Sequence, residues 1–266
     1  MTTAVERSSS HIRTQWEILS REYQRHNAVS PPLSEDAVAD EEQEYEAADY
    51  IVTPSEFAYQ SFLDRGFDER SVKCIPFGVD PPPTTSCSRD SETVRFLFAG
   101  NVSIRKGIPY LLEAWDKVDL PDAELAIASE VEKDLRPLIS DYEERNDVRL
   151  LGWVDDLEDC FNRSSVFVFP SLEEGSAIVT YEAMAAGLPL ITTYNSGWVG
   201  EDGVHGIEVP AADSGSLANA LRKLYDDASE RRRMGKEAET LIRENYTLDD
   251  YGERVHQAYR SMIDSN

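Results

Sequence analysis

Cysteine and long apolar runs are scarce in this sequence of 266 residues. The three cysteines, Cys74, Cys87 and Cys160, form no closely spaced pair, and their number is odd. This argues against a zinc site and a disulfide framework, and it fits a reducing compartment. No apolar run approaches the length that spans a membrane, and the opening residues MTTAVERSSS contain no apolar signal segment. We therefore expect a cytoplasmic chain.

Positive charge is also in short supply. Lys and Arg total 26, and only six of them are Lys, against 51 Asp and Glu, so the formal net charge is −25. Because this charge repels phosphate, we expect no nucleic-acid partner. The acidic residues are spread along the chain, which favours a halophilic protein that stays soluble at very high salt. An acidic interaction face is the alternative.

Several common catalytic signatures are missing. The sequence has neither a GxxxxGK[ST] phosphate loop nor a GxSxG nucleophile turn, and His205 is interpreted as a loop residue. Three acidic pairs, Asp155–Asp156, Asp226–Asp227 and Asp249–Asp250, fall at expected helix starts or on exposed helices. Helix capping explains such pairs better than metal binding. We therefore expect no metal and no cofactor.

From residue 94 onward, short apolar runs alternate with amphipathic ones. The pattern predicts strands at 94–100, 123–129, 148–154, 165–170, 188–193 and 206–210. It predicts helices at 108–118, 131–145, 157–164, 176–187 and 216–228. Such alternation is typical of βαβ units, and right-handed crossovers then give an α/β fold with a Rossmann-like, doubly wound parallel sheet.

The first 93 residues do not complete a domain of their own. They predict a helix at 11–26, a helix–strand–helix unit at 44–67 with Ser55 as its N-cap, and a strand at 72–80. A single strand cannot form a sheet, so we expect this part to pack on the main domain or on a missing partner. A last helix is expected at 247–263, capped by Thr247. We divide the chain into residues 1–80, a linker at 81–93, a main domain at 94–246 and a C-terminal helix at 247–266 that packs back on the N-terminal part.

Unusual residues follow the first strand of the main domain. Arg105 and Lys106 stand between Gly100 and Gly107, directly before a predicted helix. Ligands of an open parallel sheet bind at the carboxyl ends of its strands. Two cations at a helix N-terminus form a site for phosphate oxygens. A surface basic pair is the alternative.

The loop and helix at 171–182 carry a second group of candidate residues. Gly175 precedes a helix expected to start near Ser176, which leaves backbone N–H groups for an anion. Glu174 lies in the loop, and Glu182 about two turns into the helix. A carboxylate offers two acceptor oxygens and suits a cis-diol such as that of ribose. The alternative for Glu182 is a solvated helix face. In a third loop, the backbone at 152–154 is expected to support a base or sugar.

These segments, in this order, resemble one family. The resemblance rests on ADYIVTPSEF, IPFGVD, FLFAGNVSIRKGIPYLLEAW, LLGWV, VFVFPSLEEGSAIVTYEAMAAGLPLITT and EDGVHGIEVP, and it runs from about Asp49 to Tyr259. It is to the retaining glycosyltransferases with two Rossmann domains (GT-B fold), the group that includes glycogen, sucrose and mannosyl transferases. The resemblance implies that residues 94–246 are the C-terminal, nucleotide-sugar-binding domain. It also implies that residues 1–80 are a remnant of the N-terminal, acceptor-side domain.

The resemblance implies a substrate pair and a role for each matching residue. A retaining hexosyltransferase would move a sugar from a nucleotide-diphosphate sugar to a glycan or lipid-linked acceptor in polysaccharide biosynthesis. The catalytic residues would be Arg105 and Lys106 on the diphosphate and Glu174 on the donor sugar. The remaining donor-binding residues would be Glu182 on the ribose, Val154 near the base, and Gly100, Asn101, Gly175, Ser176, Ala177, Ile178 and Val179.

The sequence departs from the family pattern in its first part. The glycine-rich loop and the histidine that a complete first domain supplies are missing, and residues 196–203 lack the usual Pro-Glu. A second hypothesis is therefore a non-catalytic or partner-dependent donor-binding half, completed by an N-terminal domain or partner subunit. A nucleotide-sugar epimerase or a phosphorylase of similar fold is a third. Because such acceptors are often lipids, peripheral binding at the inner face of the membrane is the alternative to a freely cytoplasmic protein.

Overall fold

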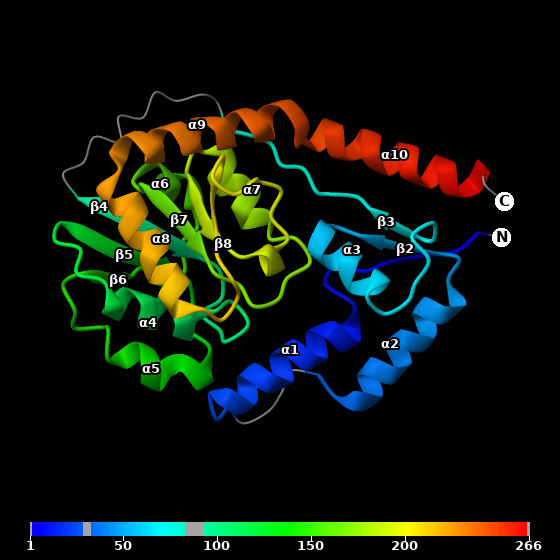
Figure 1. Ribbon diagram of the computed structural model, residues 1–266, viewed down its shortest axis with the longest axis horizontal. Coiled ribbons are helices and arrows are strands. Elements are labelled where there is room, and N and C mark those ends of the chain that lie inside the picture. Colours follow the sequence, from blue (N-terminus) through cyan, green and yellow to red (C-terminus); the bar gives the residue numbers. More distant parts are fainter. Residues whose placement is uncertain (1, 29–32, 83–92, 265–266) are drawn as a thin grey trace.

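The computed structural model describes residues 2–28, 33–82 and 93–264, so Cys87 and most of the expected linker lie outside the described residues. Its larger sheet has six strands in the order β6-β5-β4-β7-β8-β9, and every pair is parallel (Figure 1). The strands are β4 (Val94–Ala99), β5 (Ala123–Ala128), β6 (Val148–Leu150), β7 (Val166–Phe169), β8 (Leu190–Thr192) and β9 (Gly206–Glu208).

The strand order contains a topological switch point. From β4 the chain moves outward to β5 and β6, and it then returns to the other side of β4 to form β7, β8 and β9. This is the order of a Rossmann domain, so the predicted fold class is confirmed. The loops that leave β4 and β7 diverge at the middle of the sheet, which is where ligands of such folds bind.

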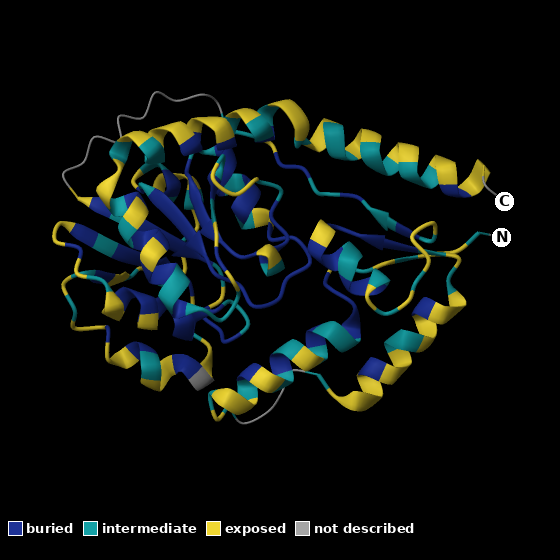
Figure 2. Cartoon of the chain, viewed as in Figure 1, coloured by how far each residue is buried: buried dark blue, intermediate teal, exposed yellow. Residues whose placement is uncertain are grey.

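Helices cover both faces of this sheet, and its central strands β4 and β7 are therefore almost entirely apolar. Phe96, Leu97 and Phe98 of β4 are fully buried, as is the whole of β7 (Figure 2). The helices are α4 (Ile108–Lys117), α5 (Arg136–Ser140), α6 (Leu157–Asn162), α7 (Ile178–Ala185), α8 (Ser214–Asp226) and α9 (Ala228–Asn245). The helix α4 packs with α8, and α7 packs with α9. Burying each large apolar side chain contributes about 1.5–3 kcal/mol to the stability of the fold. The stable sheet then holds the ends of the loops that leave it.

Several elements differ from the sequence prediction, including the strand expected at 72–80, which ends at Cys74. The helix expected at 131–145 is reduced to a 3₁₀ turn and α5, because Pro137 lacks an N–H and is tolerated only in a first turn. The strand expected at 148–154 ends at Leu150, before Gly152 at φ +67°. The helix α9 was not predicted; it is highly charged and buries only a narrow stripe. Gly187, at φ +75°, follows the end of α7 as expected.

The N-terminal part forms a sheet, contrary to expectation. Strands β1 (Ala4–Glu6), β2 (Tyr50–Thr53) and β3 (Val72–Cys74) are parallel in the order β1-β2-β3. Sequence reasoning missed β1 because it is three residues long and largely exposed. The helices are α1 (Ile12–Arg25), α2 (Glu35–Ala47) and α3 (Glu56–Leu63), and Ser55 caps α3 as predicted. A small core joins these elements: Ile12, Val38, Tyr45, Ile51, Phe62 and Val72.

The last helix, α10 (Leu248–Asp264), lies along the N-terminal sheet (Figure 1). Its Met262 forms a small buried cluster with Val52 of β2 and with Ile75. Thr247 caps it as predicted, because its hydroxyl accepts from the amide of Asp250 at 3.2 Å. The chain therefore starts and ends in the same smaller unit.

His11, at the start of α1, makes the smaller unit sensitive to acid. Its ring packs against Tyr45 and Phe62, and its Nδ1 accepts from the amide of Arg13 at 3.1 Å. Burial, aided by the charge of Arg65, lowers the pKa of His11 from 6.5 to about 4. Its contribution to the free energy of unfolding is thus fully present above pH 6.5 and is lost as the pH falls toward 4.

We expect urea denaturation to show stability falling across this window, and less steeply in His11→Asn, which keeps a capping oxygen but cannot titrate. If the free energy of unfolding fell equally steeply in the two proteins between pH 6.5 and pH 4, His11 would not be the cause of the acid sensitivity.

Candidate functional site

The loops that leave β4 and β7 are fastened to each other at the switch point. The amide of Leu172 donates to the carbonyl of Arg105 at 2.8 Å, and the Arg105 Nε donates to the carbonyl of Glu173 at 3.0 Å. Gly107, at φ +74°, lies so close to Pro170 that a Cβ there would stand 2.0 Å from the Pro170 carbonyl oxygen. Only glycine allows this approach. The two loops therefore form one preorganised wall.

A cavity of about 440 Å³ opens beside this wall. Its lining gathers most of the predicted site residues: Gly100, Asn101, Lys106, Glu174, Ser176, Ala177, Ile178, Val179 and Glu182. Ala99, Leu157 and Phe169 add an apolar side. The volume and the mixture of an apolar wall with a few polar groups are typical of a small-molecule site.

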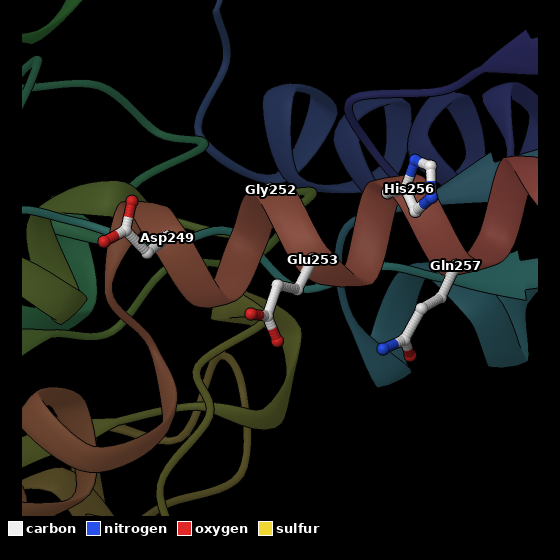
Figure 3. Close-up of a pocket in the computed structure, with 5 residues that line it drawn as sticks. All are labelled: Asp249, Gly252, Glu253, His256 and Gln257. Atoms are coloured by element: carbon white, nitrogen blue, oxygen red, sulfur yellow. The ribbon is translucent and has the colours of Figure 1, made fainter.

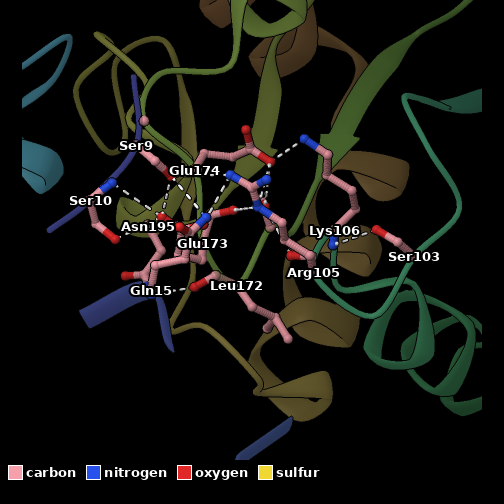
Figure 4. A network of polar contacts seen from close by, with 12 residues as sticks. Ser9, Ser10, Gln15, Ser103, Arg105, Lys106, Leu172, Glu173, Glu174 and Asn195 are labelled. Carbon is pink, nitrogen blue, oxygen red and sulfur yellow. Dashed lines mark hydrogen bonds and ion pairs between the residues drawn. The ribbon is translucent and has the colours of Figure 1, made fainter. Parts of the chain in front are cut away.

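Lys106 and Glu174 form an ion pair within the cavity lining. The Lys106 Nζ contacts Glu174 Oε1 (Figure 4). It also lies 5.2 Å from the centre of the Phe169 ring. The Ser171 hydroxyl donates to the same Glu174 oxygen at 3.3 Å. An aromatic face and a carboxylate thus hold the ammonium in place. An anionic ligand would compete with Glu174 for it.

Glu182 is a half-buried carboxylate in the cavity wall, on the second turn of α7. Burial raises its pKa, and no group in the described part of the chain hydrogen-bonds to it or pairs with it. A partly desolvated acceptor without a donor is unfavourable unless a ligand supplies the donor. Two adjacent hydroxyls would do so.

The start of α7 offers backbone donors to the same cavity. The amides of Ile178 and Val179 have no hydrogen-bond partner among the residues that the structure describes. The amide of Ala177 is already used, since it donates to the carbonyl of Ser196 at 3.1 Å. The Ser176 hydroxyl is used too, donating to the carbonyl of Gly197 at 2.9 Å. The helix begins two residues later than predicted, and the residues that carry these two amides line the cavity.

Arg105 has a different main partner from Lys106, although both approach the same Glu174 oxygen, Arg105 through its Nε at 3.9 Å. It lines a second cavity, of about 320 Å³, between the β4 loop and α1. Its guanidinium pairs with the carboxylate of Glu173 at 3.0 Å. Asn101 and Lys106 line both cavities, so the two cavities adjoin at these residues. Both residues of the predicted basic pair therefore line the second cavity, and only Lys106 also lines the larger one.

Two further predicted residues lie outside both linings. Val154 packs against the core of the larger sheet. Gly175 meets the N-terminal segment, where a Cβ would stand 1.9 Å from the carbonyl oxygen of Ser8. Its lack of a side chain therefore serves the contact between the two units of the chain.

Sequence reasoning missed Glu173. Its side chain is fully buried, and it lies at the centre of the polar network of Figure 4. Its partners come from α1 and the segment before it, more than 150 residues away in the sequence. No local pattern could therefore have indicated it.

Another hollow and the acidic pairs do not form a second candidate site among the described residues. The hollow of Figure 3 is lined by residues of α10 alone, Asp249, Gly252, Glu253, His256 and Gln257, so no second element converges on it. In the described part of the chain, no group of His, Cys, Asp or Glu could hold a metal ion. Asp156 caps α6, as predicted, and Asp227 caps α9, so both pairs have a capping residue. None of the described helices is long and apolar enough to cross a membrane.

The larger domain is a Rossmann domain with a cavity at its switch point, the place where ligands of open parallel sheets bind. A model of the family described as Glycosyl transferases group 1 matches residues 93–227, half of the chain. The chain belongs to this family of glycosyltransferases.

Known proteins agree with this assignment. The putative glycosyltransferase YtcC of Bacillus subtilis is 30% identical over 246 residues, which cover 80% of this chain and 60% of that protein. The sucrose-phosphate synthase of Thermosynechococcus elongatus superposes with a TM-score of 0.78 at 22% identity, covering 99% of this chain and 68% of the other. Anabaena HepE, solved with UDP and glucose, gives 0.75 at 18% identity, covering 89% and 70%. The chain thus spans about half to three fifths of the length of the curated relatives it matches.

Proposed function

We propose that the larger cavity binds a nucleotide-diphosphate sugar and that the chain transfers the sugar to a glycan or lipid-linked acceptor. The observation that carries this proposal is Glu182, a half-buried carboxylate without a described partner. The cis-diol of a ribose supplies two hydroxyl donors to it. The Anabaena neighbour was solved with UDP, which supports a nucleotide as the ligand class.

The diphosphate would lie between Lys106 and the start of α7. When the bond from the sugar C1 to phosphate breaks, negative charge gathers on the departing diphosphate and the sugar becomes oxocarbenium-like. The ammonium of Lys106 and the amides of Ile178 and Val179 are placed to stabilise that charge. Glu174, freed from Lys106, can then accept from hydroxyls of the sugar.

The transfer would retain the configuration at C1. Glu174 is assigned to hydroxyls of the sugar and Glu182 to the ribose, so neither carboxylate is assigned as a covalent nucleophile. In the step we propose, the acceptor oxygen bonds to C1 on the face that the phosphate leaves. The acceptor proton passes to the leaving phosphate oxygen, so that charge and atoms balance. We further propose that the acceptor enters through the second cavity, whose Gln15, Tyr23 and Ser103 suit a sugar.

A thermal-shift screen with UDP-, GDP- and ADP-sugars tests the donor site. We expect one nucleotide class to stabilise the wild type, Glu182→Ala to lose this shift, and Arg105→Ala to retain most of it. The screen is run in molar and in dilute salt, because a net charge of −25 weakens anion binding when salt is low. No shift with any nucleotide would overturn the proposal. A shift without transfer would favour the partner-dependent hypothesis.

Glu174→Gln is expected to separate diphosphate binding from sugar transfer. It removes the carboxylate that competes for Lys106, so the affinity for a nucleoside diphosphate without sugar should rise severalfold. Turnover of the complete donor should fall, because the sugar loses a charged acceptor. Calorimetry and nucleotide-release kinetics measure the two effects. Weaker diphosphate binding in this variant would show that Lys106 needs the ion pair.

A further inference from the structure

Glu173 is the most completely satisfied acid near the site. Its Oε1 accepts from the hydroxyls of Ser9 and Ser10, at 2.6 and 2.7 Å, and from the Ser10 amide at 3.2 Å. Its Oε2 accepts from the Gln15 Nε2 at 2.9 Å and pairs with the Arg105 Nη2 at 3.0 Å. The carboxylate is fully buried. Ser9, Ser10, Gln15 and Arg105 around Glu173 are called the Glu173 cluster below.

The Glu173 cluster joins three parts of the chain that the sequence keeps apart. Ser9 and Ser10 follow β1 of the smaller sheet, Gln15 lies on α1, and Arg105 belongs to the loop after β4 (Figure 4). The neighbouring Glu174 lines the larger cavity, whereas Arg105 and Gln15 line the second one. One buried carboxylate therefore lies between the two cavities and touches the walls of the second.

Arg105 is anchored on one side only. Its Nε donates to the Glu173 carbonyl, and its Nη2 contacts Ser9 and the Glu173 carboxylate. Its Nη1 has no hydrogen bond among the described residues. A guanidinium held by Nε and Nη2 presents Nη1 in a fixed direction, because the group is planar. The anchoring thus leaves one edge of the group available to a ligand.

We propose that Glu173 is a positioning residue that clamps residues 8–15 to the loop between β7 and α7 and fixes Arg105 at the wall of the second cavity. The consequence for catalysis rests on the proposed function, whereas the clamp itself does not. A buried charge with five donors is costly to leave unpaired, so the segment and the loop should open and close together.

Glu173→Gln tests the clamp with almost no change of shape. The amide nitrogen of the introduced glutamine replaces one carboxylate oxygen. Where it meets Gln15 and Arg105, two donors face each other, and the hydrogen bonds on that side of the cluster are lost. We expect site-resolved hydrogen exchange to show the Ser10 amide exchanging at least tenfold faster, with β7 unchanged. Glu22→Gln is the matched control. Glu22 is a similarly buried acid on α1, but its partners are Tyr110 and Arg21, so the Ser10 amide should keep its protection.

Turnover of the donor identified by the screen gives the second readout. We expect Glu173→Gln to lower kcat at least tenfold with the donor KM within twofold, and Glu173→Gln/Arg105→Ala to be no slower than Arg105→Ala. Unchanged Ser10 exchange would overturn the clamp, and additive kcat losses would overturn the action through Arg105. If the wild type turns over no donor, the proposed function fails, and the exchange result alone decides the clamp.

Discussion

Replacing Lys106 by alanine is expected to slow sugar transfer about a hundredfold, because one preorganised charge-stabilising group contributes about 3 kcal/mol to a transition state. Lys106 is the only Lys or Arg that lines the larger cavity among the described residues. The amides of α7 cannot replace a full charge on a departing diphosphate. Single-turnover kinetics with a saturating donor would measure the effect on the chemical step.

Lys117→Ala is the control for Lys106→Ala. Lys117 lies near the end of α4, where it pairs with Glu113 on the surface at 2.9 Å, and we expect its removal to leave the rate unchanged. A Lys106→Ala protein that transfers sugar within threefold of the wild-type rate would contradict the assigned role. A rate loss that is equal in both variants would point to a general effect of charge.

Glu182→Gln is expected to weaken donor binding about 10- to 100-fold while making the free protein more stable. The loss of affinity follows from replacing a charged acceptor of two hydroxyls by a neutral amide. The gain in stability follows because the carboxylate is partly desolvated without a partner in the described chain. Function and stability thus oppose each other at this residue. Calorimetric titration and thermal unfolding test the two halves.

The pH dependence of stability gives an independent check on Glu182. Its pKa is raised in the folded protein, so the folded state binds a proton more readily than the unfolded chain. The associated stability is fully present below the unfolded pKa and is lost as the pH rises through the folded pKa. Glu182→Gln should therefore lose less stability over that rise than the wild type. Glu158→Gln, an exposed acid on α6, should behave as the wild type does.

The switch point could be predicted because its signals are local. Continuous apolar strands, Gly107 before α4, and Glu174 and Glu182 around the start of α7 all fall within short windows of sequence. The structure brings most of the residues from these windows together in the lining of one cavity. The apolar runs also indicated the Rossmann-like order, because a parallel sheet buried on both faces needs them.

The remaining features depend on contacts between distant segments. The strand β1 is short and exposed, so no hydrophobic pattern marks it. Arg105 and Lys106 are neighbours in sequence, but the contacts of Arg105 with the buried Glu173 and with Ser9 hold it at the second cavity, whereas Lys106 lines both cavities. Gly175 was assigned to the ligand, but the Ser8 backbone is what requires it.

Hydrogen exchange of the backbone, with and without the nucleotide-diphosphate sugar chosen by the screen, tests the location of the donor most directly. The account predicts that the ligand slows exchange at Ile178 and Val179, where α7 begins with unpartnered amides, and in the loop at 100–106 that carries Lys106. Protection confined to the second cavity or to α10, with no change at the start of α7, would contradict the assignment of this cavity as the donor site.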